Sequence, residues 1–212
     1  MTVSPEAHAE HEGHQSMGSL NAMAASATLH CLTGCAIGEI AGLMIGTAAG
    51  LSNTATIALS VALAFLFGYS LSTLPLLNAG LPFRTALKVV LAADTLSILT
   101  MEIVDNAVMA AIPGAMNAGL VNVTFWIGMM ISLAAAFAAA YPVNRMLLKR
   151  GKGHALAHEY HGMPAQRRFP AFATSTLVAV LVAFMLGGLV VAIAAETAEP
   201  STPTPSSSTH AS

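Results

Sequence analysis

Long apolar stretches, separated by short polar or Gly/Pro-containing joins, dominate the chain. Five of them lie near residues 24–51, 54–77, 85–112, 120–148 and 170–195. Each is long enough to cross a hydrocarbon core about 30 Å thick as a helix. The alternation expected of barrel strands is missing, and in lipid the backbone must satisfy its own hydrogen bonds. The pattern therefore predicts an all-α, polytopic membrane helix bundle, with a four-helix core plus one C-terminal transmembrane helix.

Glycine and proline mark the joins between these stretches. Pro75, Pro82, Pro113 with Gly114, and Pro164 lie at or near their edges. A helix can end at such positions without losing an interior hydrogen bond. We therefore expect the helices to end close to these residues.

Composition agrees with a membrane location. Hydrophobic residues make up 55% of the chain and charged residues 8%, against roughly 25% charged residues in an ordinary soluble domain. The expected surroundings are therefore the lipid bilayer, and a net charge of −2 indicates no nucleic-acid partner. HExxH, GxSxG and phosphate-loop motifs are absent, so the sequence predicts no enzyme.

The basic residues predict an orientation. All eight Lys and Arg flank the join between the second and third stretches or the join between the fourth and fifth. Because basic residues concentrate on the cytoplasmic side, we expect a cytoplasmic N-terminus and an extracytoplasmic C-terminus. The N-terminal residues lack the pattern of a removable signal peptide, so none is expected.

This topology divides the chain into five segments. In order they are a His-rich cytoplasmic tail, a four-helix transmembrane core, a basic and His-rich cytoplasmic link, a fifth transmembrane helix and a disordered Pro/Ser/Thr-rich tail. Their predicted bounds are residues 1–23, 24–148, 149–169, 170–195 and 196–212.

The first apolar stretch holds both cysteines of the chain, within HCLTGCAIGE. The candidate metal ligands there are His30, Cys31, Cys35 and Glu39. Cysteines four residues apart share a helix face, and their soft sulfur favours Cu(I) or zinc. The alternative is that both cysteines are small residues that fill a helix contact.

Glycine recurs every four residues along the same stretch. The positions are Gly34, Gly38, Gly42, Gly46 and Gly50. They drift slowly around the side of the helix that also carries the cysteines. Glycines at this spacing predict a close crossing with another membrane helix.

The third stretch carries carboxylates among otherwise mostly apolar residues. Asp94, Met101, Glu102 and Asp105 fall on one side of its helical wheel and form a candidate ion pathway. A charge at a membrane helix centre costs about 2.5 to 3.5 kcal/mol on insertion scales, and such residues usually mark an ion or proton path. The alternative is a structural cluster of protonated carboxyls. Its candidate partners are Tyr69, Ser72, Thr73 and Asn122.

Two histidine tracts lie on the predicted cytoplasmic side and are candidates for collecting metal ions. They comprise His8, His11, His14, His154, His158 and His161. The alternatives are a chance His-rich linker for the first tract and an interfacial helix for the second, with histidines that titrate near neutral pH.

Three motifs together resemble a bacterial four-helix integral membrane domain family of unknown function. They are HCLTGCAIGE, ADTLSILTMEIVDN and YPVNRMLLKRGKGH, the last of which includes Tyr141, Pro142 and Asn144. The resemblance covers about residues 28–162. It implies a four-helix core in the bacterial inner membrane, with the fifth helix an appendage of this chain. It implies no activity.

The residues thus suggest a non-enzymatic membrane protein that binds, and handles or transports, copper or zinc through a Cys/His/carboxylate track. No organic cofactor is indicated. The alternative is a structural or assembly subunit of a larger membrane complex, whose glycine face and acidic stripe pack against partner helices. A homo-oligomer is a further expected arrangement for so small a bundle.

Overall fold

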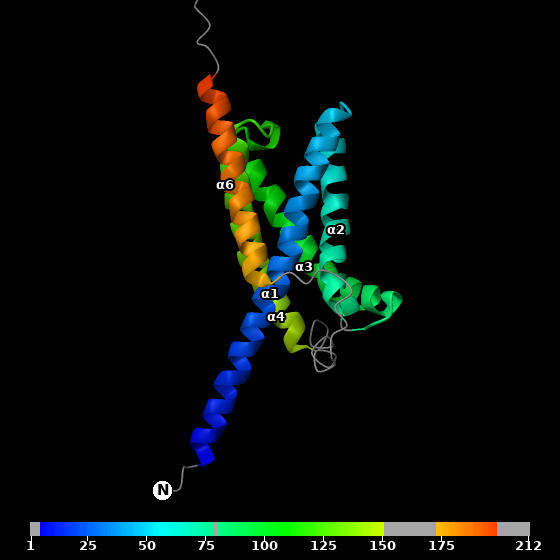
Figure 1. Ribbon diagram of the computed structural model, residues 1–212, viewed down its shortest axis with the longest axis vertical. Coiled ribbons are helices and arrows are strands. Elements are labelled where there is room, and N and C mark those ends of the chain that lie inside the picture. The colour runs from blue at the N-terminus through cyan, green and yellow to red at the C-terminus, as the bar shows by residue number, and fades with distance from the viewer. Residues whose placement is uncertain (1–4, 79, 151–172, 199–212) are drawn as a thin grey trace, which may run out of the picture.

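The computed structural model describes residues 5–78, 80–150 and 173–198, with side chains from residue 18 onward. This part of the chain contains helices and loops and no strand (Figure 1). The helices are α1 (Pro5–Ala48), α2 (Asn53–Asn78), α3 (Phe83–Ala111), the short 3-10 helix η1 (Ala115–Asn117), α4 (Val123–Lys149) and α6 (Thr174–Ala198). The predicted all-α bundle is confirmed.

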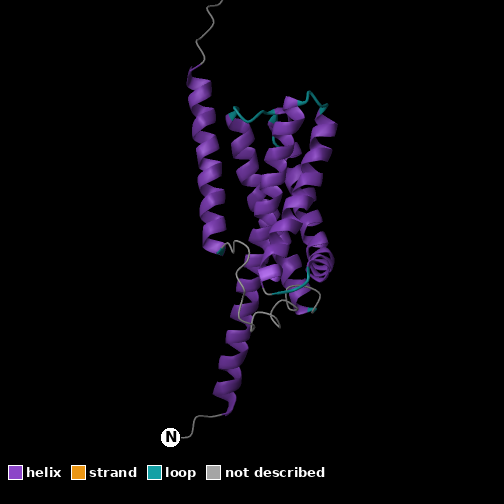
Figure 2. Cartoon of the chain, turned by 45° about the vertical axis from the view of Figure 1, so that its right-hand side comes forward, coloured by secondary structure: helices purple, strands orange, loops and turns teal. Residues whose placement is uncertain are grey.

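Successive helices run in alternate directions, so their joins gather at two ends of the bundle (Figures 1 and 2). Residues 49–52 and 112–122 form one end, here called the loop end, where α6 also finishes. The opposite end, here called the basic end, carries the described basic side chains: Arg84, Lys88, Arg145, Lys149 and Arg150. The helices α1, α3 and α6 therefore run from the basic end to the loop end.

In the described part of the chain, four helices are long and apolar enough to cross a membrane: α1 from residue 18, α2, α4 and α6. The remaining long helix, α3, carries three acidic residues in its sequence but buries all of them. Between these acidic residues, the large side chains on its outward face are apolar, with Leu96, Leu99 and Ile103 exposed by 44–61%. α3 therefore offers lipid an apolar surface and keeps its acidic residues inside the bundle.

The main differences from the expected helix bounds lie in the first and last helices. α1 begins at Pro5, so His8, His11 and His14 lie on the helix, which extends beyond the bundle at the basic end (Figure 1). α6 ends at Ala198, so residues 196–198 are helical and do not belong to the predicted disordered tail. Pro75 lies in the last turn of α2, near its end at Asn78. The second histidine tract (His154, His158, His161), Pro164 and the tail from residue 199 lie outside the described residues.

The glycine row of α1 packs against α2. A Cβ on Gly34 would lie 2.5 Å from the Gly68 Cα, and one on Gly38 would lie 2.2 Å from the Ala64 backbone nitrogen. Gly42 and Gly46 meet the next small residues of α2, Ser60 and Thr56. Each four-residue step along α1 thus matches a four-residue step back along α2, and the two backbones come into direct contact.

Gly50 does not belong to this packing face, contrary to its spacing. It follows the end of α1, has a φ of +66°, and has open space where a Cβ would be. Its role is conformational, since the left-handed region is open to glycine at little cost.

A further contact attaches α6 to α4. A Cβ on Gly188 of α6 would lie 2.3 Å from the ring of Trp126, whose indole nitrogen donates to the Leu120 carbonyl oxygen over 2.7 Å. At the loop end, Glu196 Oε1 accepts a hydrogen bond from the Val123 backbone nitrogen over 3.0 Å. This bond satisfies one of the unpaired N–H groups in the first turn of α4.

The α1/α2 contact can be tested with the smallest possible substitution, Gly38→Ala. The added methyl group would meet the α2 backbone, which cannot move aside as a side chain can. We expect a loss of about 1–3 kcal/mol in the free energy of unfolding, the usual scale of overpacking, measured by thermal or denaturant unfolding in detergent. Gly187→Ala on α6 is the matched control, because a Cβ there meets open space. Equal stability of the two variants would show that the contact tolerates side chains.

Candidate functional site

The helix face next to the glycine row carries the polar residues of α1. Because Gly34 and Gly38 face α2, the residues one position further on, Cys35 and Glu39, turn toward α3, as does Cys31 one helical turn earlier. Cys31 is 0% exposed, Cys35 2% and Glu39 9%. Eight residues of helix separate Cys31 from Glu39, a rise of about 12 Å.

The helices α1 and α3 run in the same direction, and their polar residues meet in order. Asp94 faces the thiol of Cys31, Glu102 faces the thiol of Cys35, and Asp105 faces the carboxyl of Glu39. We call these six residues the α1/α3 track. Asp94, Glu102 and Asp105 are 2%, 4% and 5% exposed, so the whole track lies inside the bundle.

At the basic end of the track, hydroxyl groups surround the first thiol. Cys31 Sγ lies 3.7 Å from Ser72 Oγ of α2, and Ser97 of α3 is a further neighbour. One turn earlier, Asn144 Nδ2 of α4 donates a hydrogen bond to Thr28 Oγ1 over 2.8 Å. The polar interior therefore continues from Cys31 toward the basic end through side chains of three other helices.

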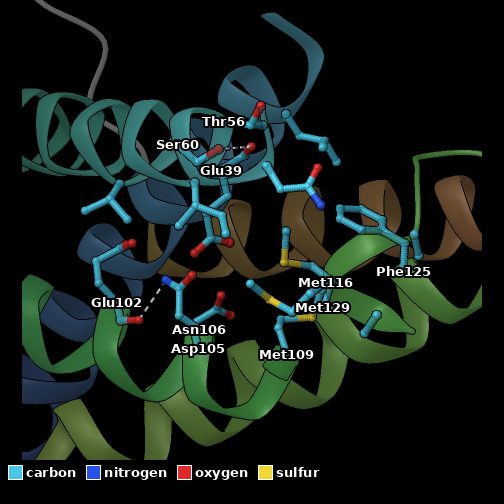
Figure 3. A pocket seen from close by; sticks show the side chains of 16 residues that line it. Glu39, Thr56, Ser60, Glu102, Asp105, Asn106, Met109, Met116, Phe125 and Met129 are labelled. Atoms are coloured by element: carbon cyan, nitrogen blue, oxygen red, sulfur yellow. Dashed lines mark hydrogen bonds between the residues drawn. The ribbon is translucent and has the colours of Figure 1, made fainter. Parts of the chain in front are cut away.

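At the loop end, the track opens into a cavity of about 110 Å³, where the Glu39, Glu102 and Asp105 carboxyls face its interior (Figure 3). One water needs only about 10–15 Å³ by this kind of measure, so the cavity can hold several waters or a hydrated ion. Neither carboxyl oxygen of Glu39 or of Glu102 has a hydrogen-bond partner in the described structure, and neither does Oδ1 of Asp105. The cavity thus contains acceptors that the protein itself leaves unsatisfied.

These carboxyls also lack a nearby cation from the described part of the protein. Its Lys and Arg side chains lie at the basic end, whereas the cavity lies at the loop end. Burying a carboxylate without a hydrogen bond or a counter-charge is expensive. An acidic site of this kind is stabilised by a cation or by protons supplied from outside.

Polar side chains hold the wall of the cavity in place. Ser60 Oγ donates to the Glu39 backbone oxygen over 3.3 Å, and Asn106 Nδ2 donates to the Glu102 backbone oxygen over 2.9 Å (Figure 3). Asn53 Nδ2, at the start of α2, donates to Asn117 Oδ1 over 2.7 Å and so ties α2 to η1. These bonds involve backbone oxygens and neutral groups, and none of them uses a carboxyl oxygen of Glu39, Glu102 or Asp105.

The structure does not gather the four predicted metal ligands of α1 into one site. His30 is half-buried, and its Nδ1 lies 2.8 Å from the Ser26 backbone oxygen. Among the residues with described side chains, no three His, Cys, Asp or Glu groups lie close enough to hold one metal ion. Metal binding by His30, Cys31, Cys35 and Glu39 therefore stays a prediction.

The candidate ion pathway is brought together on the inner face of α3. Met101, 1% exposed, is buried on the same face as Asp94, Glu102 and Asp105. Of the four partners considered for a structural cluster, Ser72 alone adjoins Cys31 in the described contacts. The Tyr69 hydroxyl pairs with Thr95, the Thr73 hydroxyl donates to the Tyr69 carbonyl, and Asn122 caps α4.

Met109, Met116 and Met129 line the cavity from α3, η1 and α4. Sequence reasoning places Met109 on the same side of its helix as the carboxylates but missed Met116 and Met129. It also missed Ser132, which lies beside Asp105. Methionines are common fillers of apolar segments, so their positions in the sequence carry no signal until the three elements are placed together.

Comparison with known proteins identifies a family. The family model of a domain of unknown function, DUF4396, matches residues 20–153. The chain belongs to this family. The DUF4396 region includes α1 from residue 20, α2, α3 and α4, and so contains the whole α1/α3 track and the cavity, while α6 lies beyond it. No curated protein and no solved structure matches the chain.

Proposed function

We propose that this protein binds a cation at the loop-end cavity and passes it, or a proton in exchange, along the α1/α3 track. The observation that carries the proposal is the set of unsatisfied, buried carboxyl oxygens of Glu39, Glu102 and Asp105 around a cavity large enough for an ion. Intramembrane carboxylates that face a bundle interior usually belong to ion or proton paths.

Copper or zinc is the cargo that the side chains favour. Two thiols lie along the track, each beside a carboxyl of α3. Sulfur ligands select soft metal ions over the hard cations that prefer oxygen alone. In this proposal the carboxyls attract the ion and the thiols bind it deeper in the bundle.

The alternative is a structural subunit of a larger complex. Both surfaces that suggested it are covered within this chain. The glycine row contacts α2 of the same chain, and the acidic stripe is buried within the bundle. Neither surface is open to a partner helix. The exposed side chains of α6, such as Val180, Val190 and Val191, are equally suited to lipid contact.

The carboxyls are tested by Glu102→Gln, because an amide keeps the shape of the side chain but carries no charge and exchanges no proton. We expect purified wild-type protein in liposomes to move zinc or copper, and the variant to do so about tenfold more slowly, as when a metal ligand loses a charged partner. Glu196→Gln is the matched control, since it lies outside the track and an amide oxygen can still accept the bond from Val123. Equal rates for Glu102→Gln and wild type, or no wild-type transport above empty liposomes, contradict the proposal.

The thiols are tested with the Cys31→Ser, Cys35→Ser double variant, in a background where His8, His11 and His14 are alanine. We expect the background protein to bind about one equivalent of zinc and the double variant to lose it, because a hydroxyl is a poor substitute for a thiolate ligand. Elemental analysis after dialysis measures the equivalents. Full stoichiometry in the double variant would leave the thiols only a packing role.

From the distribution of basic residues we propose an orientation in which the basic end lies in the cytoplasm and the loop end outside. We expect alkaline phosphatase, active only outside the cytoplasm, to be active when fused after Ser212 and inactive when fused before Met1 of the full chain. A fluorescent protein that matures in the cytoplasm should give the opposite result at each position. The reverse pattern would place the carboxyl cavity on the cytoplasmic side.

A further inference from the structure

Three thioethers from three different elements converge on the loop-end cavity. Met109 comes from α3, Met116 from η1 and Met129 from α4, and they gather on the side of the cavity away from Glu102 (Figure 3). Met109 is 7% exposed and Met129 2% exposed. Gly128 leaves room for the Met109 thioether, since a Cβ there would lie 3.0 Å from its sulfur.

The donor types of the cavity distinguish between metal ions. Zinc is held in proteins by thiolate, imidazole and carboxylate groups, whereas a thioether is a soft, neutral donor that suits Cu(I). The described lining of the cavity contains three methionines and neither cysteine nor histidine. This combination favours a soft monovalent ion over zinc.

The carboxyls supply what the thioethers lack. Three neutral sulfurs cannot balance the charge of an ion in a low-dielectric interior, but the carboxyl group of Glu39 and Oδ1 of Asp105, which have no hydrogen-bond partner in the described structure, belong to residues that line the same cavity. Conversely, the described carboxyls by themselves do not form a metal-holding group. Each set of donors therefore needs the other.

We propose that the loop-end cavity is a Cu(I) site in which Met109, Met116 and Met129 provide the sulfur ligands and Glu39 with Asp105 the counter-charge. This inference rests on the proposed function, since it names the ion that enters the α1/α3 track. In this site the thioethers select a soft ion, and the carboxyls balance its positive charge. Oxidation state matters because Cu(II) prefers nitrogen and oxygen ligands in tetragonal geometry.

The test compares two sets of Met→Leu substitutions in the full-length protein, in a background where Cys31 and Cys35 are serine and His8, His11 and His14 are alanine. The first replaces Met109, Met116 and Met129, and the matched control replaces Met130, Met146 and Met185, which do not line this cavity. Leucine conserves the volume of methionine and removes only the sulfur. Binding of Ag(I), a soft monovalent ion that needs no reductant, is measured in chloride-free detergent solution and repeated with Cu(I) under ascorbate.

We expect the first set to weaken Ag(I) and Cu(I) binding by about 10- to 100-fold, the scale seen when a metal site loses supporting ligands, and the control set to bind as the background protein does. Unchanged binding in the first set overturns the Cu(I) site. If the first set does not fold, Met116→Leu alone decides, because Met116 lies on the short η1 segment and is only partly buried.

Zinc transport separates this inference from the proposed function. Should wild-type protein move zinc in a Glu102-dependent way while the methionine variants bind Ag(I) normally, the cation track stands and the thioether site does not. Should Glu102→Gln leave all transport unchanged while the methionine variants lose Ag(I), the cavity binds soft ions without passing them along the track.

Discussion

Direct backbone contact between α1 and α2 determines which side chains face the interior of this bundle. Where Gly34 and Gly38 touch the α2 backbone, no side chain separates the helices, so α1 has little freedom to rotate. The residues next around the helix, Cys35 and Glu39, must then face α3. Turning α1 by one residue, about 100°, would press a cysteine against the α2 backbone. The glycine row thus positions the polar residues without taking part in their chemistry.

The insertion of α3 depends on this arrangement. As an isolated helix α3 would expose Asp94, Glu102 and Asp105 to lipid, at a cost of about 2.5–3.5 kcal/mol each on insertion scales. In the bundle all three are buried, and leucine and isoleucine side chains face outward. Glu102 and Asp105 are still unfavourable in this interior, because both carboxyl oxygens of Glu102 and Oδ1 of Asp105 have no hydrogen-bond partner in the described structure. A protein retains such groups when an external ion or proton completes them, which is the basis of the function proposed here.

The sequence predicts the helices better than it predicts their partners. Apolar length is sufficient for α2, α4 and α6, but the start of α1 at Pro5 was missed because the polar first part of this helix has no hydropathy signal. Gly50 shows that spacing alone misleads, since it continues the four-residue row but belongs to a turn. The partner of the glycine row was open to prediction from Thr56, Ser60, Ala64 and Gly68, small residues with the same four-residue spacing. Glu39 and Asp105 come together, as do the three methionines, only because separate helices cross. The sequence of a single helix could not predict either contact.

The track is polar along its length but not equally open. The cavity reaches Glu102, and one turn closer to the basic end the side chain of Ile98 is 0% exposed and packs where a Cβ on Gly68 would lie 2.9 Å from its Cδ1. In the proposed path, a cation at Glu102 would lie beside the Cys35 thiol, with the apolar side chain of Ile98 one turn further toward the basic end. Ile98 fills the space that a side chain at position 68 would take. The polar residues of the α1/α3 track thus lie on both sides of one buried apolar residue, and an ion moving as proposed would have to pass it to reach Cys31 and Asp94.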